Sequence, residues 1–300
     1  MVKLILLCAA LTAVAIINLA AEAPDLTASI ALYKQKDYVN AELGFSQLAG
    51  QYPEDPNIAY YLGRIARHQK HYDQAVSYLE KATRLAPTNA AYFVALGDAY
   101  GAIANVNHSF TAARQTCTAL EHAVELAPTS EEARAALITF CRSAPSIVGG
   151  GMVKAYDQAK ELRTLDAPAG TRLLATLYEG ERRYDEAIAA CEETLRDQAN
   201  NYGLLYVTGR IAAASGTHLD EGIAALEKCL TLPAVEEFPG YAFAHVRLGQ
   251  LYAKKSAMAD ARRHFDAALQ LDPTNKDAST GLENLPQILN VSPGSLSTAP

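Results

Sequence analysis

The 300-residue sequence predicts an all-α solenoid of about seven antiparallel helix pairs, closed by a C-terminal capping helix. The first observation is a step of 34 residues that separates Gly63 from Gly97, each in a Leu-Gly pair. The same step separates two alanines and two prolines, Ala41 from Ala75 and Pro53 from Pro87. The second is the composition, 50% apolar and 20% charged, which is enough to build a core. A fixed period of this length is typical of stacked helical repeats.

Each unit is predicted to pair a first helix that carries a small residue with a second helix of fixed pattern. The clearest example of the second-helix pattern is Tyr72-x-x-Ala75-x-x-x-Leu79-x-x-Ala82, and Pro87 ends this helix. The pattern returns, in whole or in part, at three further starting points, Tyr38, Tyr184 and Met258. Small residues let two antiparallel helices approach closely, and proline ends the second helix because it cannot continue one.

These residues closely resemble the tetratricopeptide repeat, although its early Trp is absent. The resemblance implies a right-handed superhelix whose concave groove is lined by the first helices. The predicted units cover residues 24–55, 56–89, 90–129, 130–169, 170–200, 201–239 and 240–274. A capping helix is expected over residues 276–285. The solenoid as a whole is assigned to residues 22–285, and the Ser- and Pro-rich residues 286–300 are expected to be a disordered tail.

Two irregularities interrupt the period. Pro87 and Pro128 lie 41 residues apart, and the excess is expected around residues 105–110. A Pro- and Gly-rich segment, residues 143–151, replaces the short turn of the fourth unit and is expected to be a flexible connector. Leu-Gly-Asp-Ala-Tyr-Gly at residues 96–101 together with Ala-Pro-Ser-Ile-Val-Gly-Gly-Gly at residues 144–151 looks like a group of bacterial envelope repeat proteins. That likeness implies no activity.

The N-terminus predicts export. Lys3 is the only charge before Glu22, and an apolar stretch from Leu4 to Ala21 ends in small residues, which is typical of a secretory signal peptide at residues 1–21. We therefore expect the protein to be periplasmic or otherwise exported. The alternative is an uncleaved membrane anchor, because a stretch of this length just spans a bilayer.

Charge and motifs exclude several classes of function. A net charge of -7, with no basic run, argues against a nucleic acid as partner. Residues 149–154 lack the Gly-Lys-Ser/Thr ending of a phosphate loop, and no Gly-x-Ser-x-Gly or His-Glu-x-x-His motif occurs. His68 and His71 are interpreted as solvated residues at a turn. We therefore predict no enzyme, no cofactor and no metal site.

Cysteine usage leaves two possibilities open. Four cysteines would remain after removal of the signal peptide, namely Cys117, Cys141, Cys191 and Cys229. In an oxidising compartment they could form two disulfides. Alternatively they are buried thiols on helix faces, the usual state of a free cysteine.

The groove supplies the candidate site. Residues three before and one after each small Gly should face it, as i, i+4 neighbours on the first helix. The positions assigned to partner binding are Tyr60, Arg64, Asp98, Tyr206, Arg210 and Gln250, with Val94 and Val246 beside them. Tyr and Arg are common anchors of protein interfaces. The alternative is that the tyrosines pack against neighbouring helices and the arginines are solvated. The Lys and Asn of a chaperone-type carboxylate clamp are absent from these places.

The resulting hypothesis is an exported scaffold that binds a protein or peptide of unidentified sequence in its groove. An enzyme or enzyme subunit with a site in the irregular residues 101–151 is one alternative. A purely structural component of the envelope is another. Contact with a membrane is expected only if the signal segment stays uncleaved.

Overall fold

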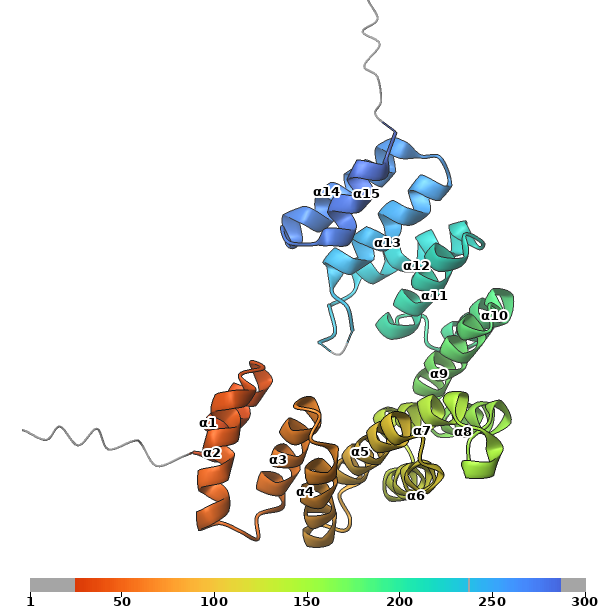
Figure 1. The fold of residues 1–300 in the computed structure, drawn as a ribbon. Coiled ribbons are helices and arrows are strands. Elements are labelled where there is room, and N and C mark those ends of the chain that lie inside the picture. The colour runs from red at the N-terminus through yellow and green to blue at the C-terminus, as the bar shows by residue number, and fades with distance from the viewer. Residues whose placement is uncertain (1–24, 237, 287–300) are drawn as a thin grey trace, which may run out of the picture. The chain divides into compact units, whose positions relative to one another are not determined.

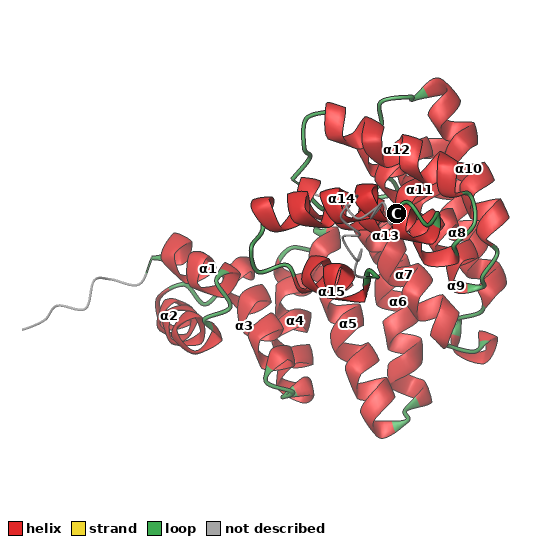
Figure 2. Ribbon diagram, turned by 90° about the horizontal axis from the view of Figure 1, so that it is seen from above, coloured by secondary structure: helices red, strands yellow, loops and turns green. Residues whose placement is uncertain are grey.

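A computed structural model describes residues 25–236 and 238–286, which form helices joined by short loops (Figures 1 and 2). The predicted signal peptide and residues 287–300 of the predicted tail lie outside the described residues. The helices are α1 (Leu26–Lys34), α2 (Tyr38–Gln51), α3 (Pro56–His68), α4 (Tyr72–Leu85), α5 (Ala90–Asn107), α6 (Phe110–Leu126), α7 (Glu131–Ser143), α8 (Met152–Leu165), α9 (Ala167–Gly180), α10 (Tyr184–Asp197), α11 (Tyr202–Ser215), α12 (Leu219–Thr231), α13 (Tyr241–Lys254), α14 (Met258–Leu271) and α15 (Lys276–Asn284). These seven pairs and one closing helix confirm the predicted all-α solenoid. Within the described residues, no helix has the length and apolar character needed to cross a membrane.

The described residues form two compact units that divide after Pro87, so that α1–α4 belong to the first and α5–α15 to the second. In the first unit the core lies between α2 and α3, where Phe45 and Ile65 are fully buried. In the second unit each first helix packs against its own second helix and against the next first helix, in the order α5, α7, α9, α11, α13 and α15. The first helices of this unit therefore form one continuous row.

Close helix contacts explain the recurring glycines. A Cβ atom added at Gly97 of α5 would lie 2.7 Å from Leu120 Cγ of α6. An atom added at Gly249 of α13 would lie 2.6 Å from the ring of Phe265 on α14. These distances are too short for a real Cβ, so a larger residue would force the two helices of the pair apart.

Helix ends follow from local residues. Asp, Asn or Ser side chains cap the first helices of most pairs, as Asp55 does by accepting from the backbone N–H of Asn57 at 2.8 Å. In several turns a residue other than glycine has a positive φ, in the left-handed region of backbone conformation. These residues are Lys36, Lys70, His108, Arg182, His218 and Ser256.

The first irregularity consists of longer helices rather than an added loop. Helices α5 and α6 have 18 and 17 residues, and the chain reverses at His108, whose φ is 51°. The extra residues between Pro87 and Pro128 therefore extend the third pair at its turn.

The second irregularity is a packed turn, so the expectation of a flexible connector was wrong. Residues Ser146–Val148 form a 3₁₀ turn, and the Gly151 N–H donates to the Cys141 carbonyl at 2.8 Å. A Cβ atom at Gly149, whose φ is 90°, would lie 2.5 Å from Cys117 Sγ on α6. Glycine is needed here for both the backbone conformation and the close approach.

Arg134 is the one charged residue among the most deeply buried side chains of the described chain, with no exposed surface. From α7 its Nε donates to the Pro128 carbonyl at 2.7 Å. Its Nη1 donates to Gln158 Oε1 at 2.9 Å, and its Nη2 to Glu161 Oε1 at 3.2 Å. One guanidinium thereby joins α7, the loop before it and α8.

Candidate functional site

In the first unit, Arg64 lies against two tyrosine rings. Its Nη1 donates to the Tyr60 hydroxyl at 2.6 Å. Its guanidinium carbon lies 5.2 Å from the ring centroid of Tyr33 on α1 and 5.3 Å from that of Tyr60 on α3. Both Tyr60 and Arg64 are half-buried. The arginine is thus held in place on the first helix, with part of its surface accessible to a partner.

In the second unit, Tyr206 and Arg210 occupy the positions that correspond to Tyr60 and Arg64, but their contacts differ. Tyr206 on α11 is only 5% exposed and belongs to the core between α11, α12 and α13. Arg210 is half-buried and forms an ion pair with Glu179 on α9, its Nη1 lying 2.6 and 2.8 Å from the two carboxylate oxygens. Tyr206 therefore packs against neighbouring helices, as the alternative interpretation of the tyrosines expected. Arg210 offers a partner a charge that is already neutralised within the chain.

The two other predicted positions differ in exposure. Asp98 is exposed on α5, whereas its neighbour in the predicted face, Val94, is 8% exposed. Gln250 on α13 is half-buried and accepts a hydrogen bond from Arg247 Nη1 at 2.9 Å. Asp98 is therefore exposed and Gln250 partly exposed, whereas Val246 is buried at 1% exposure.

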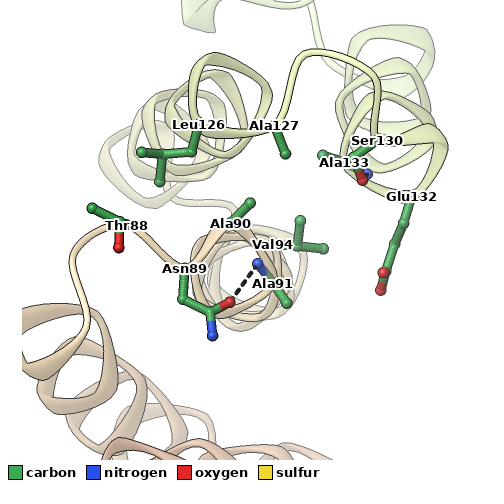
Figure 3. Close-up of a pocket in the computed structure, with 10 residues that line it drawn as sticks. All are labelled: Thr88, Asn89, Ala90, Ala91, Val94, Leu126, Ala127, Ser130, Glu132 and Ala133. Atoms are coloured by element: carbon green, nitrogen blue, oxygen red, sulfur yellow. Dashed lines mark hydrogen bonds between the residues drawn. The ribbon is translucent and has the colours of Figure 1, made fainter.

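An open pocket of about 540 Å³ lies where α5 and α7 begin (Figure 3). Asn89 Oδ1 accepts from the Ala91 N–H at 3.1 Å, and Ser130 Oγ accepts from the Ala133 N–H at 3.2 Å. Both helix ends are thus capped by their own side chains. Glu132 is the one ionisable residue among those that line this pocket.

The irregular residues 101–151 contribute to a polar cluster around Lys154, which follows them on α8. Lys154 Nζ donates to Glu121 Oε1 at 2.6 Å, to the Gly149 carbonyl at 2.8 Å and to Cys117 Sγ at 3.3 Å. Burial raises the pKa of the Cys117 thiol despite the neighbouring lysine. A buried thiol with a raised pKa is a poor nucleophile, so the cluster gives no support to an enzymatic site here.

The four cysteines of the described chain are buried thiols. Burial raises the pKa of Cys141 and Cys191 to about 11, and that of Cys229 to about 12. The ring of His68 stacks on Tyr38 with centroids 4.4 Å apart, so this histidine packs against an aromatic ring besides contacting solvent. No group of three potential metal ligands occurs in the residues that the structure describes.

Three contacts of the second unit were missed by the sequence interpretation. Arg172 of α9 pairs with Glu131 of α7 and lies 5.0 Å from the ring centroid of Phe238. His245 contacts His264 across the last pair. Arg247 lies three residues before Gln250 on the same face. The only signal for Arg247 in the sequence was its position on a first helix, directly after Val246.

Comparison with known proteins adds the following similarities. The tetratricopeptide repeat matches residues 56–89 and 242–275, and a second tetratricopeptide repeat family matches residues 172–232. No enzyme domain is among these family matches, and no curated protein matches the chain.

Several solved structures of low sequence identity are similar to this chain. A tetratricopeptide repeat protein from Parabacteroides merdae is 14% identical, with a TM-score of 0.50 over 86% of this chain and 95% of that one. PilW, a type IV pilus biogenesis factor, is 15% identical, with a TM-score of 0.47 over 76% and 98%. A thermophilic tetratricopeptide protein from Thermus thermophilus is 20% identical, with a TM-score of 0.46 over 69% and 97%. At 14% identity the similarity to the Parabacteroides merdae structure shows the fold alone.

Proposed function

Because the chain is a tetratricopeptide repeat protein, we propose that it is an exported scaffold that binds a protein or peptide partner along its first helices. The observation that carries the proposal is the continuous row of α5, α7, α9, α11, α13 and α15 in the second unit. Such a row offers an extended face on which a partner segment contacts successive repeats. Export to the periplasm is part of the proposal and rests on the signal-like residues 1–21.

Polar and charged side chains on this face support recognition of a partner. On this face Asp98 of α5 is exposed and Gln250 of α13 is half-buried. Separately, in the first unit, Arg64 of α3 lies against the rings of Tyr33 on α1 and Tyr60 on α3. Arginine held by aromatic rings loses little conformational freedom when it binds a carboxylate, which favours its use as an anchor.

Site-specific photo-crosslinking tests the proposal. A benzophenone amino acid is placed at Asp98 or Gln250, on first helices, and at Gln115, an exposed position of the second helix α6, as the control. In the envelope fraction of the native host, we expect the same partner to crosslink to the first two positions and not to the third. Crosslinking that is equal at all three positions, or confined to Gln115, contradicts a first-helix binding face.

A further inference from the structure

The two irregularities of the repeat meet at one end of the helices α5–α8. The extended turn of the third pair joins α5 to α6, and the 3₁₀ turn of the fourth pair lies between α7 and α8 (Figure 1). Arg114 Nη2 of α6 donates to the Ile147 carbonyl of the 3₁₀ turn at 3.4 Å. Lys154 Nζ, near the start of α8, donates to the Gly149 carbonyl at 2.8 Å. The two turns and the start of α8 therefore lie side by side.

Four large apolar side chains are exposed at these turns, and together they are here named the turn patch. Val106 on α5 is 60% exposed, Phe110 on α6 66%, Ile147 in the 3₁₀ turn 68% and Val153 on α8 77%. Single apolar residues are common on protein surfaces, whereas large ones gathered in adjoining segments often mark an interaction site.

The corresponding turns of four other pairs are charged. Each carries an exposed Lys or Arg, namely Lys36, Lys70, Arg182 and Lys255. In contrast, residues 105–113 and 143–153 contain no Lys, Arg, Asp or Glu. A turn that only reverses the chain in water has no need of exposed apolar side chains, as the four charged turns demonstrate. The apolar composition is therefore particular to the third and fourth pairs, and it indicates a surface that another molecule covers.

The charges beside the turn patch favour a second copy of this chain as that molecule. Arg114 lies one helical turn after Phe110 on α6, and Asp157 lies one turn after Val153 on α8. Both are exposed, and neither forms an ion pair within the part of the chain that the structure describes. A two-fold axis brings the same surface of two copies together, so each copy would offer one charge of each sign to the other.

The size of the turn patch also fits a dimer. Side chains of this kind have accessible surfaces of roughly 150–200 Å² each, so the four expose on the order of 500 Å² together. A standard interface buries about 800 Å² on each partner, and about two thirds of that area is apolar in homodimers. The patch thus supplies about the apolar area that a dimer of standard size needs.

We propose that the turn patch is a two-fold interface between two copies of this chain, in which Arg114 of one copy faces Asp157 of the other. The proposal goes beyond the proposed scaffold function and does not depend on it. The interface is built from helix turns, whereas the scaffold function is assigned to the row of first helices.

Sedimentation velocity measures the association of protein purified from the native host. We expect a monomer–dimer equilibrium at concentrations up to about 200 µM. Val153→Glu and Ile147→Glu each place a carboxylate in the patch and should weaken the dimer at least tenfold. Val39→Glu is the matched control, because Val39 is 76% exposed and is, like Val153, the second residue of its helix. It should leave the equilibrium unchanged.

Two results of this experiment would overturn the proposal. The first is a monomer at every concentration. The second is a dimer that Val153→Glu and Ile147→Glu weaken no more than Val39→Glu does. Circular dichroism checks that the helices of each variant are intact, which is expected because all three positions are exposed.

A charge exchange tests the two-fold arrangement. Arg114→Glu and Asp157→Arg should each weaken the dimer, because each brings like charges together across the interface. The double variant should restore association at least in part, since opposite charges again face each other. Single variants that dissociate the dimer without any restoration in the double variant would contradict this arrangement.

Photo-crosslinking identifies what covers the patch. A benzophenone amino acid at Ile147 in the native host should give a product of twice the mass of the chain that contains only this chain. A product with a different protein would instead make the patch a site for another partner and overturn the proposal. Because the dimer product contains only this chain, its absence leaves the crosslinking result at Asp98 untouched, and the two proposals are separable.

Discussion

The Nδ1 atoms of His245 on α13 and His264 on α14 lie 2.9 Å apart, so one ring donates a hydrogen bond to the other. The Nε2 atom of His264 is buried and has no partner in the described residues. If His264 donated from Nε2, that buried N–H would be unsatisfied. The favoured tautomer of His264 therefore carries its proton on Nδ1 and donates to His245.

This pair predicts loss of stability in mild acid. Burial, then the neighbouring His245 and Arg263, lower the pKa of His264 from 6.5 to about 4, against the weaker raising effects of Glu227 and Asp260. Because the unfolded chain binds this proton below pH 6.5 and the folded chain does not, stability is complete above pH 6.5 and falls towards pH 4. Between pH 7 and 5 we expect a loss of about 2 kcal/mol. Urea unfolding at several pH values measures it, and His264→Leu should flatten the slope; an unchanged slope contradicts the prediction.

Overpacking of a helix contact should be costly only where the structure has no room. Gly97→Leu and Ala75→Leu add atoms at fully packed contacts, whereas Ala259 is exposed on α14. The first two variants should each lose about 1–3 kcal/mol or more, and Ala259→Leu close to nothing. Urea unfolding followed by circular dichroism compares the three. Equal losses would mean that the repeat register is wrong.

The buried guanidinium of Arg134 should not be replaceable by an amine. Arg134→Lys keeps the charge but cannot reach the Pro128 carbonyl, Gln158 and Glu161 together, so we expect a loss of about 1–3 kcal/mol. Glu161→Gln is the matched control, because that carboxylate is 58% exposed and its removal should cost less than about 1 kcal/mol. Both are measured by urea unfolding. Similar losses in the two variants would show that the ion pair, and not the three-way fork, is what matters.

Arg64 and Arg210 should contribute to partner affinity. Each charge-assisted hydrogen bond to a carboxylate is worth roughly 1.5–3 kcal/mol, so removing both should weaken binding at least tenfold, and high salt should imitate the loss. Calorimetry with the partner found by crosslinking tests Arg64→Ala, Arg210→Ala and the double variant.

The Arg210 variant needs a control of its own because Arg210 already binds Glu179. Glu179→Gln frees the guanidinium without removing it and should not weaken the partner. Unchanged affinity in all arginine variants, with intact helices by circular dichroism, would leave both residues without a binding role.

Export predicts a shortened protein. In the native host the mature chain should begin near Glu22, since small residues precede it and the charged Lys3 precedes the apolar stretch. N-terminal sequencing of the purified protein decides the point. A membrane-bound product that begins at Met1 would instead indicate an uncleaved anchor.

The helices could be predicted from the sequence because their signals are local. Pro56 and Asp55 begin α3, and the expected capping helix at residues 276–285 is α15 at Lys276–Asn284. The repeat period also placed Gly97 and Gly249 at helix contacts.

Interactions between neighbouring helix pairs could not be predicted from local signals. Arg210 and Glu179 are 31 residues apart, and their pairing depends on how two first helices pack side by side. The contact of Cys117 with Gly149 could not be predicted for the same reason. Because of this contact, the Gly-rich segment that the sequence suggested to be flexible is packed against α6. A single sequence records the period but not the side-chain geometry between neighbouring pairs.

The row of first helices also has a mechanical consequence. The substantial contacts of the second unit join helices that are adjacent in the chain or next but one. A force applied to the two ends is then carried by the helix pairs in series, each of which must bear the full load. Stretched in an optical trap, such a chain lengthens in steps, and the weakest pair sets the force at which the first step occurs.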